Sequence, residues 1–296
     1  MNITLCTDLD NTLLPNGRQV SDPHSIDLLH RLIRQQHITL IYVSGRDKRL
    51  VLDAISEYDL PLPQYAITDV GTQIHRIDSS DDANFAKKHA KNSLLWQEDL
   101  HWQQHLQKGW DAEKLNAVKN KLQDYSHLHC QEPEKQSRFK LSYYLDTRHY
   151  ESDIKQDVEN ICQQTGIKCN VVKSYNETTS TGLLDVLPAD ASKYHAIRFL
   201  MDKHAITEKE ILFCGDSGND LDVLTSEIPA VLVNNAQTSV KQRARQLADK
   251  HHHNAQLYIA KGNFCGLNGY YCSGILEGLA YYYPEFKKLI CENIRL

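Results

Sequence analysis

The order of apolar runs and helical patterns near the start of the chain limits it to a few architectures. Residues 3–7, 38–43 and 65–68 are short apolar runs typical of buried strands. Between them, residues 22–36 and 49–58 repeat apolar side chains at helical spacing. Strands that alternate with helices form a parallel sheet with helices on both faces. We therefore predict an α/β fold with a Rossmann-like core.

Two polar segments, residues 78–82 and 176–182, interrupt this alternation. The block between them has a different pattern, whereas strand and helix alternate again after the second segment. Two linkers around a block of different pattern indicate one domain inserted into another. We predict a discontinuous core of residues 1–79 and 177–296 and an inserted α+β cap of residues 80–176.

The expected elements can be placed along the rest of the chain. Strands are expected at 139–145, 169–172, 184–187, 211–214 and 230–233, and helices at 150–165 and 193–203. All three tryptophans, Trp96, Trp102 and Trp110, fall in the predicted cap, where we expect them to form its small core.

Charge and cysteine content narrow the class of protein. Lys and Arg total 33 against 38 Asp and Glu, and this net charge of −5 disfavours a nucleic-acid-binding surface. We find no apolar run long enough to span a membrane, and the first residues lack the regions of a signal peptide. The eight cysteines form no Cys-x-x-Cys pair. In a chain of this length we expect free thiols and a reducing, cytoplasmic location.

Two carboxylates follow the first predicted strand. Asp8 and Asp10 lie two residues apart on an extended segment, so their side chains point to the same side. They would meet beyond the carboxyl end of a parallel strand, where open α/β sheets bind ligands. Two carboxylates held together favour a bound cation or proton. An Asp-rich turn or a helix cap would give the same short pattern.

Three further segments have the same placement. Ser44 and Gly45 end the second strand beside a helix start, which suits a phosphate oxygen, although an ordinary turn has the same sequence. Lys193 lies in the first turn of a helix, where a cation opposes the helix dipole, although a single lysine is usually solvated. Residues 215–220 place Asp216 and Asp220 among glycines after a buried strand.

The four segments together indicate more than each one does alone. A parallel sheet would bring all of them to one edge. Carboxylate ligands without histidine or cysteine suit Mg²⁺, which binds one or two carboxylates together with phosphate oxygens. The sequence therefore predicts a magnesium-dependent phosphoryl-transfer site.

These motifs resemble those of the haloacid dehalogenase (HAD) superfamily, whose signature begins Asp-x-Asp-x-Thr. The resemblance implies that Asp8 is the nucleophile and forms an aspartyl-phosphate. It implies that Asp10 is the general acid and then the base that activates water, and that Lys193 completes the catalytic group. It further implies Mg²⁺ held by Asp8, the Asp10 backbone carbonyl and Asp216, with Asp220 supporting them. Asp10 also separates this sequence from the dehalogenases proper, which lack the second acid.

The resemblance also implies which groups hold the phosphoryl oxygens and stabilise the transition-state charge. These groups are Asp8, Thr12, Ser44, Gly45, Lys193 and Asn219.

The insertion resembles the larger, C2-type cap of sugar phosphatases in this superfamily. The closer resemblance is to sucrose-phosphate phosphatases, through residues 70–72, 139–143, 185–188, 233–236 and 273–278. Such a cap would close over the substrate and exclude water. The sugar contacts that it implies are Arg46, Thr72, Gln73, Lys140, Ser142, Tyr143 and Asp185.

Three positions depart from the pattern of that family. Gln73 replaces a Glu, Leu183 an Asp, and Tyr194 a Gly. All three are expected near the sugar, so they affect the choice of substrate rather than the phosphoryl chemistry.

The resemblance implies a magnesium-dependent phosphatase that hydrolyses a disaccharide phosphate, with sucrose 6-phosphate as the expected substrate. Three alternatives stay open: a related glycoside phosphate such as mannosylfructose or glucosylglycerate phosphate, a sugar phosphomutase, and a non-catalytic partner of a sugar-phosphate synthase. We expect a monomer, with a sucrose-phosphate synthase as its possible protein partner.

Overall fold

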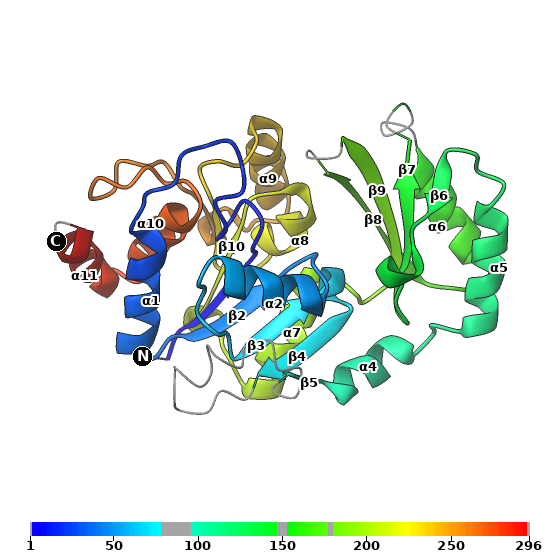
Figure 1. Ribbon diagram of the computed structural model, residues 1–296, viewed down its shortest axis with the longest axis horizontal. Coiled ribbons are helices and arrows are strands. Elements are labelled where there is room, and N and C mark those ends of the chain that lie inside the picture. Colours follow the sequence, from blue (N-terminus) through cyan, green and yellow to red (C-terminus); the bar gives the residue numbers. More distant parts are fainter. Residues whose placement is uncertain (1, 78–95, 147, 149–152, 177–179, 295–296) are drawn as a thin grey trace.

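The computed structural model describes residues 2–77, 96–146, 148, 153–176 and 180–294, which form two sheets (Figure 1). The larger sheet has eight strands in the order β12-β11-β10-β1-β2-β3-β4-β5. Its first six strands are parallel, and β4 and β5 are antiparallel to their neighbours. Its strands are β1 (Thr4–Thr7), β2 (Thr39–Val43), β3 (Tyr65–Thr68), β4 (Gln73–Ile77), β5 (Trp96–Glu98), β10 (Ile211–Gly215), β11 (Ala230–Leu232) and β12 (Leu257–Ile259).

Helices cover both faces of this sheet, because alternate strand residues are apolar on both sides. Leu5 and Leu212 pack with one set of helices, whereas Cys6 and Phe213 pack with the other. The first set is α1 (Ser25–Gln35), α2 (Lys48–Glu57), α10 (Cys272–Tyr282) and α11 (Glu285–Ile294). The second set is α7 (Lys193–His204), α8 (Leu221–Leu224) and α9 (Thr238–Lys250). The predicted α/β core with a parallel sheet is confirmed.

The smaller sheet is antiparallel, in the order β6-β7-β9-β8. Its strands are β6 (Leu128–Cys130), β7 (Leu141–Leu145), β8 (Cys169–Asn176) and β9 (Thr181–Pro188). Helices α5 (Ala112–Leu122) and α6 (Ile154–Gln164) lie on its outer side, away from the larger sheet (Figure 1). This unit has the α+β composition expected of the cap.

The second predicted linker lies within the smaller sheet. Asn176 ends β8 and Thr181 begins β9, and these two residues are paired across the sheet. The chain therefore reverses direction here instead of leading back to the core. The first predicted linker, residues 78–82, lies outside the described residues.

The tryptophans separate between the two units, which corrects the expectation of one cap core. Trp96 belongs to β5 of the larger sheet. Trp102, in α4 (Leu100–Gln107), donates its indole N–H to the Gly71 carbonyl at 3.1 Å and packs on Phe199 of α7. Only Trp110 is in the smaller unit, where its indole donates to the Arg138 carbonyl at 2.9 Å. We therefore propose that the cap extends from about residue 108 to residue 188.

The two connections between core and cap run side by side. His105, at the end of α4, contacts the Asp190 carboxylate at 2.9 Å. Asp190 precedes α7, to which the chain returns from β9. Among the described residues, no helix is both long and apolar enough to cross a membrane.

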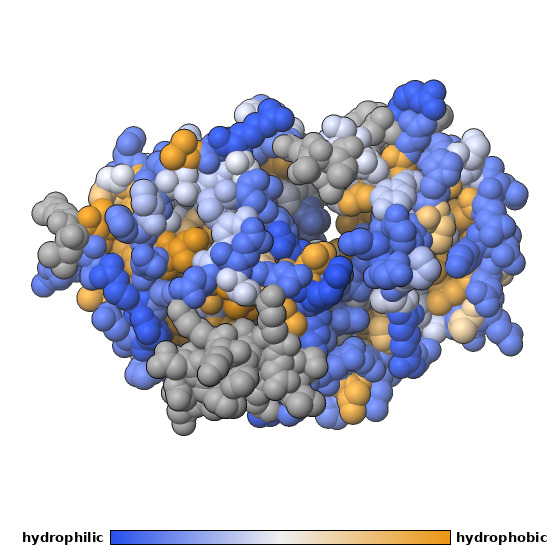
Figure 2. Space-filling view, in the orientation of Figure 1, coloured by the Kyte–Doolittle hydropathy of each residue, from blue (hydrophilic) through white to orange (hydrophobic). Residues whose placement is uncertain are grey.

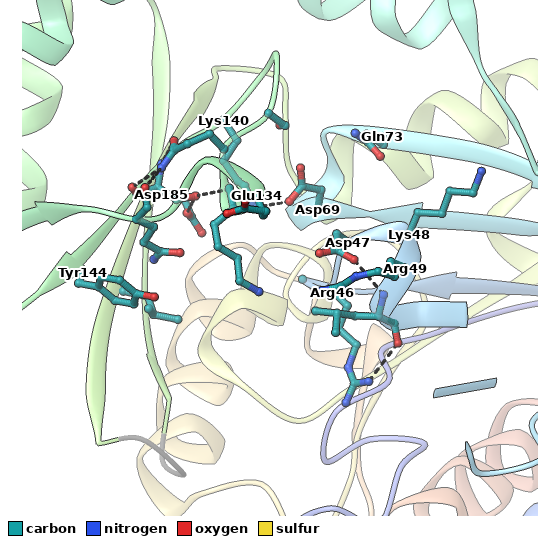
Figure 3. Close-up of a pocket in the computed structure, with 18 of the residues that line it drawn as sticks. Arg46, Asp47, Lys48, Arg49, Asp69, Gln73, Glu134, Lys140, Tyr144 and Asp185 are labelled. Carbon is teal, nitrogen blue, oxygen red and sulfur yellow. Dashed lines mark hydrogen bonds and ion pairs between the residues drawn. The ribbon is translucent and has the colours of Figure 1, made fainter. Parts of the chain in front are cut away.

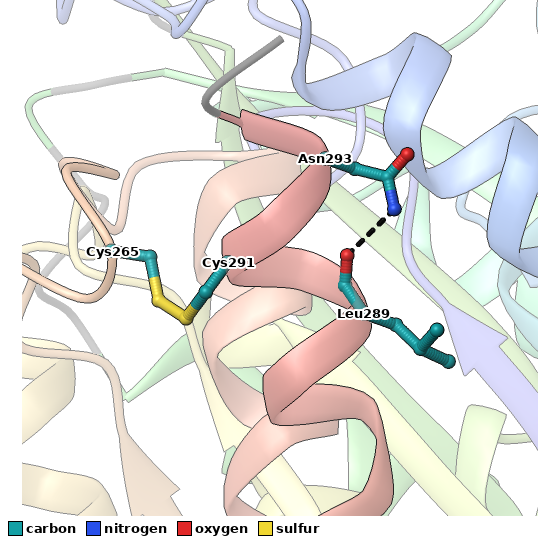
Figure 4. The surroundings of a disulfide bond; sticks show 4 residues. All are labelled: Cys265, Leu289, Cys291 and Asn293. Atoms are coloured by element: carbon teal, nitrogen blue, oxygen red, sulfur yellow. Dashed lines mark hydrogen bonds between the residues drawn. A yellow bond between two sulfur atoms is a disulfide. The ribbon is translucent and has the colours of Figure 1, made fainter.

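The expectation that all cysteines are free thiols is wrong for one pair. Cys265, in the loop before α10, forms a disulfide with Cys291 of α11, and the two Cα atoms are 5.3 Å apart (Figure 4). The remaining six cysteines are free. The bonded residues are 26 positions apart in sequence and have no motif spacing, so only the fold brings them together.

Candidate active site

The central strands carry the predicted motifs to one edge of the sheet. β1 lies between β10 and β2, so Asp8, Ser44 and Asp216 follow the carboxyl ends of three adjacent parallel strands. The backbone N–H of Asp8 donates to the Cys214 carbonyl at 2.9 Å, which continues the strand pairing by one residue. Asp8 as a whole residue is 5% exposed. The expected convergence of the motifs is thus present.

Lys193 is the centre of a buried charge cluster. Its Nζ donates to Asp8 Oδ1 at 2.8 Å and to Asp220 Oδ1 at 2.6 Å. Ser192 caps α7 by accepting the His195 N–H, so Lys193 occupies the first helical position. Burial disfavours the charged ammonium, but the Asp220 and Asp8 carboxylates outweigh that cost and raise the pKa of Lys193. This lysine is therefore ionised and held in place.

Gly71 fixes the start of α7 relative to the core. It has a positive φ of 91°, which favours glycine. A Cβ atom there would lie 2.4 Å from the Ser192 carbonyl oxygen. The approach of this loop to Ser192 therefore requires glycine and helps to position Lys193.

The carboxylates of Asp8, Asp216 and Asp220 form a group that fits a divalent cation. One oxygen from each lies within 4.8 Å of the others. Thr12 Oγ1 donates to Asp216 Oδ1 at 3.2 Å and to Asp8 Oδ2 at 3.4 Å, which links two of the acids. When ionised, three carboxylates and one ammonium leave two uncompensated negative charges. Oxygen ligands of this kind fit Mg²⁺.

The pKa values agree with this unbalanced charge. Burial raises the pKa of Asp8 to about 7, against an opposing effect of Lys193. Burial, together with Asp220 and Asp8, raises the pKa of Asp216 to about 8. Both carboxyls therefore take up protons in the metal-free protein near neutral pH, and a cation would release those protons.

Asp220 organises the loop that carries Asp216. Its Oδ2 accepts the backbone N–H groups of Asp216 at 3.1 Å and of Ser217 at 3.0 Å. Asn219 lies in the same turn, where its side-chain oxygen accepts from the Ser217 hydroxyl. The structure brings Asp216, Asp220 and Asn219 to the site as the sequence indicated.

The Asp10 carboxylate binds Arg46. The Arg46 guanidinium makes two hydrogen bonds to its carboxylate, at 2.8 and 2.6 Å, and Asn16 adds a third at 2.6 Å. Burial would raise the pKa of Asp10, but the hydrogen bonds and charge of Arg46 lower it below its usual value. Its side chain is not part of the three-carboxylate cation group.

Ser44 is fully buried and accepts the Arg46 N–H through its hydroxyl at 3.1 Å. Gly45 and Arg46 line a cavity of about 770 Å³ between the core and the cap. Figure 2 shows the surface hollowed between the two units. The phosphoryl motif therefore borders a space large enough for a small organic molecule.

The residues predicted to bind sugar divide into two groups. Five of them line the cavity: Arg46, Gln73, Lys140, Ser142 and Asp185. Thr72 does not, because it is fully buried and its hydroxyl donates to the Asp69 carbonyl at 2.9 Å. Tyr143 does not either, because alternation along β7 turns it into the core of the cap, where it is 4% exposed.

A polar network crosses the cavity from the cap to the core (Figure 3). Lys140 forms an ion pair with Asp69, and Ser142 donates to Asp185 at 2.6 Å. Burial raises the pKa of Asp185, and the Lys140 charge opposes this shift. Asp69 and the following Val70 have positive φ angles of 55° and 60°. A positive φ is unusual for the β-branched Val70, and such backbone conformations cluster at functional sites.

Sequence reasoning missed several residues of this cavity. The alternation of β7 gives Tyr144 the same orientation as Ser142, so the two-residue period could have identified it. Other lining residues lie in a loop of the cap and had no motif: Gln131, Glu134, Lys135, Gln136 and Ser137. Of the three departures from the family pattern, Gln73 and Leu183 line the cavity, whereas the Tyr194 hydroxyl donates to Glu227 at 2.9 Å.

The sequence is similar to those of known HAD-like hydrolases and sucrose-phosphatases. The chain is 45% identical over 285 residues to a chain named as a HAD-like hydrolase of Nitrosococcus oceani, covering 96% of this chain and 72% of that one. It is 24% identical over 249 residues to sucrose-phosphatase 1 of Nicotiana tabacum, covering 81% of this chain. It spans about half the length of that relative, 52%.

The fold agrees with a solved structure. The sucrose-phosphatase of Synechocystis sp. PCC6803, solved in complex with sucrose and phosphate, matches with a TM-score of 0.72 and 25% identity. The match covers 95% of this chain and 98% of that one. The sequence itself matches the family model over residues 1–283. The chain therefore belongs to the sucrose-6F-phosphate phosphohydrolase family, which consists of phosphoric monoester hydrolases with the HAD fold.

Proposed function

We propose that this protein hydrolyses a disaccharide phosphate to the free sugar and phosphate. The first candidate substrate is sucrose 6-phosphate. The observation that carries the proposal is the placement of Lys193 between Asp8 and Asp220, beside a polar cavity that the cap encloses. A buried carboxylate next to a fixed ammonium suits attack on a phosphorus atom, since the ammonium compensates charge on the phosphoryl oxygens.

In this proposal Asp8 attacks the phosphorus atom, the sugar oxygen leaves, and an aspartyl-phosphate forms on Asp8. Asp10 gives a proton to the leaving oxygen and then takes one from the water that hydrolyses the intermediate. Lys193, Ser44 and Thr12 hold the phosphoryl oxygens. Mg²⁺, held by Asp8, Asp216 and the Asp10 carbonyl, would neutralise phosphoryl charge when bound.

Arg46 has two roles in this scheme. It lines the sugar cavity and also binds Asp10, and this contact keeps Asp10 ionised. A general acid needs its proton, so we propose that Arg46 moves from Asp10 to the substrate when the substrate enters. Release of the guanidinium would raise the pKa of Asp10 at the time when it must act as an acid.

The choice of sugar rests on the cavity between the cap and the core. Its polar side chains from both units suit the hydroxyl groups of two sugar rings, and sucrose was solved with the Synechocystis relative. Gln73 and Leu183 replace the acids of the family pattern on the wall of the cavity. These changes remove two negative charges and, at Leu183, a hydrogen-bond acceptor. Because the wall therefore differs from the family pattern, mannosylfructose or glucosylglycerate phosphate is the second candidate.

A panel of sugar phosphates with Mg²⁺ tests the proposal through release of inorganic phosphate. We expect the highest kcat/KM for sucrose 6-phosphate. A higher value for another glycoside phosphate would transfer the assignment to that sugar. Transfer between hydroxyl groups without free phosphate would identify a mutase, and no reaction with any substrate would favour a binding role beside a synthase.

The nucleophile is tested separately with Asp8→Asn. The amide keeps the shape of the side chain, so the protein should fold while turnover is lost. The circular dichroism spectrum and the melting temperature are the controls for folding. Full activity of Asp8→Asn would overturn the proposed mechanism.

A further inference from the structure

A second cavity of about 610 Å³ lies at the far edge of the core sheet. Residues 257–261 of β12 and the turn after it form one wall. Lys241 and Arg245 of α9 and Tyr281 of α10 form the others. None of these residues lines the cavity between core and cap, so the two spaces are distinct.

Basic side chains surround this cavity. Lys241, Arg245 and Lys261 line it, and among the described residues that line it none is acidic. Burial lowers the pKa of Lys241, and the Arg245 charge lowers it further, so the two cations are close enough to repel each other. An anion placed between them would relieve this repulsion.

The basic groups retain donors for such an anion. Lys241 Nζ donates to the Asn234 carbonyl at 2.6 Å and to the side-chain oxygen of Asn234 at 3.2 Å, so one of its three N–H groups is left over. Within the part of the chain that the structure describes, neither Arg245 nor Lys261 has a side-chain hydrogen bond or an ion pair.

Glu277 is a buried acid that binds the turn at Lys261, and its oxygens are occupied. It accepts from the Tyr258 hydroxyl at 2.6 Å and from the backbone N–H groups of Lys261 at 2.8 Å and Gly262 at 3.0 Å. Glu277 therefore fixes the turn that carries Lys261. Among the described residues, Glu277 contacts Lys261 through its backbone N–H and not through its ammonium, so the cavity keeps its positive charge.

An aromatic surface completes the cavity. The Tyr281 ring is stacked on Tyr258, with centroids 4.1 Å apart and an angle of 20°. Tyr281 also meets Tyr282 with its ring at 90° and centroids 4.9 Å apart, but it is 56% exposed, so part of its ring remains accessible to a ligand. Stacked rings held in this way offer a flat apolar surface at little cost in side-chain entropy.

We propose that this second cavity binds a phosphorylated small molecule, with its phosphate between Lys241, Arg245 and Lys261 and its ring on Tyr281. Arginine forks and lysine charges are the usual partners of phosphate oxygens. A small molecule fits better than an added peptide strand, because β12 has only three residues and short edge strands resist strand addition. The proposal does not depend on the reaction at Asp8.

Calorimetric titration of the full chain tests the proposal, in buffer with EDTA so that no ligand is hydrolysed. The probes are inorganic phosphate, adenosine 5′-monophosphate and glucose 6-phosphate, which separate the phosphate, a nucleotide base and a sugar ring. The test variant is Lys241→Ala with Arg245→Ala. The control is Arg243→Ala with Lys250→Ala, two exposed basic residues of the same helix outside the cavity.

We expect the test variant to bind one of the probes at least tenfold more weakly than the control variant does. Phosphatase activity should be unchanged, and the melting temperature should fall only slightly, through loss of the Lys241 contacts with Asn234. Tyr281→Ala should weaken the binding of the probe that carries a ring and leave the binding of inorganic phosphate unchanged. Equal affinities and stoichiometries in the test and control variants would overturn the proposal. An equal effect of Tyr281→Ala on all probes would refute the ring contact.

Discussion

Asp220 determines much of the geometry of the active site through its two oxygens. One oxygen holds the Lys193 ammonium, and the other holds the backbone N–H groups of Asp216 and Ser217. Gly215 leaves the space that Asp220 needs, because a Cβ atom there would lie 2.7 Å from the Asp220 Cγ. A small residue before the motif is therefore a packing requirement of the fold.

Gly215→Ala is expected to lower the free energy of unfolding by about 1–3 kcal/mol, since the added methyl group must displace Asp220. Because Asp220 holds Lys193, kcat should fall as well. Urea unfolding and steady-state kinetics measure both effects. Gly218→Ala is the matched control, because a Cβ atom there meets nothing within 4 Å. Equal behaviour of the two variants would contradict this explanation.

The contact between Arg46 and Asp10 gives a prediction about pH. Arg46 lowers the pKa of Asp10, so Arg46→Ala should raise it and increase the protonated fraction near neutral pH. The limb of the kcat/KM profile that reports the acid in the free enzyme should therefore move to higher pH, and KM should rise because Arg46 also lines the cavity. Arg46→Lys, which keeps the charge without the bidentate contact, should give a smaller shift. An unchanged profile in Arg46→Ala would exclude this coupling.

Strand β7 shows how alternation separates structure from recognition. Ser142 and Tyr144 line the cavity, whereas Tyr143 packs in the core of the cap. The sequence placed Tyr143 in the site because it follows Lys140 and Ser142 in the family pattern. Alternation along the strand, applied strictly, selects Tyr144 instead.

Two alanine variants of β7 test this assignment. Tyr143→Ala should lower the free energy of unfolding by about 3–5 kcal/mol, as for a large buried aromatic side chain. Tyr144→Ala should raise KM for the sugar phosphate by removing a wall of the cavity, with a much smaller loss of stability. Thermal unfolding and substrate saturation curves distinguish the two. Similar losses of stability in both variants would show that the two side chains do not face opposite sides.

The strands and the turns between them show what the sequence could and could not predict. Short continuous apolar runs predict β1, β2, β3 and β10, because burial on both faces leaves a continuous signal. Trp96–Glu98 was not recognised as a core strand, since three residues are too few for a period. The polar segment at 176–182 was interpreted as a hinge, because a hairpin turn and a linker have the same composition. The disulfide and the cavity loop of the cap needed the fold to bring distant residues together.

The charge of the whole molecule is mildly negative, and among the described residues three carboxylates, those of Asp8, Asp216 and Asp220, lie close together at the active site. Burial raises the pKa of Asp8 to about 7 and of Asp216 to about 8, above the ordinary value of 3.8. Groups whose pKa is raised by folding stabilise the folded state at low pH, and this contribution is lost as the pH rises through their folded values.

We therefore expect the metal-free protein to lose stability between about pH 4 and pH 8 relative to Asp8→Asn with Asp216→Asn. Mg²⁺ should stabilise the unchanged protein more at pH 8 than at pH 6, because fewer protons must leave. At 100 times its Kd the ion would add about 2.7 kcal/mol. Melting temperatures with EDTA and with Mg²⁺ at both pH values measure this. A Mg²⁺ effect that persists in the double variant would place the ion elsewhere.

The adjacent connections between the core and the cap have a mechanical consequence. His105 and Asp190 touch where the chain leaves α4 and where it returns before α7. Two connections so close together join the cap to the core at nearly one place, so we expect the cap to move about that place as a unit. Such a movement would separate Lys140 from Asp69 and open the cavity. Access of substrate and exclusion of water would then depend on the same movement.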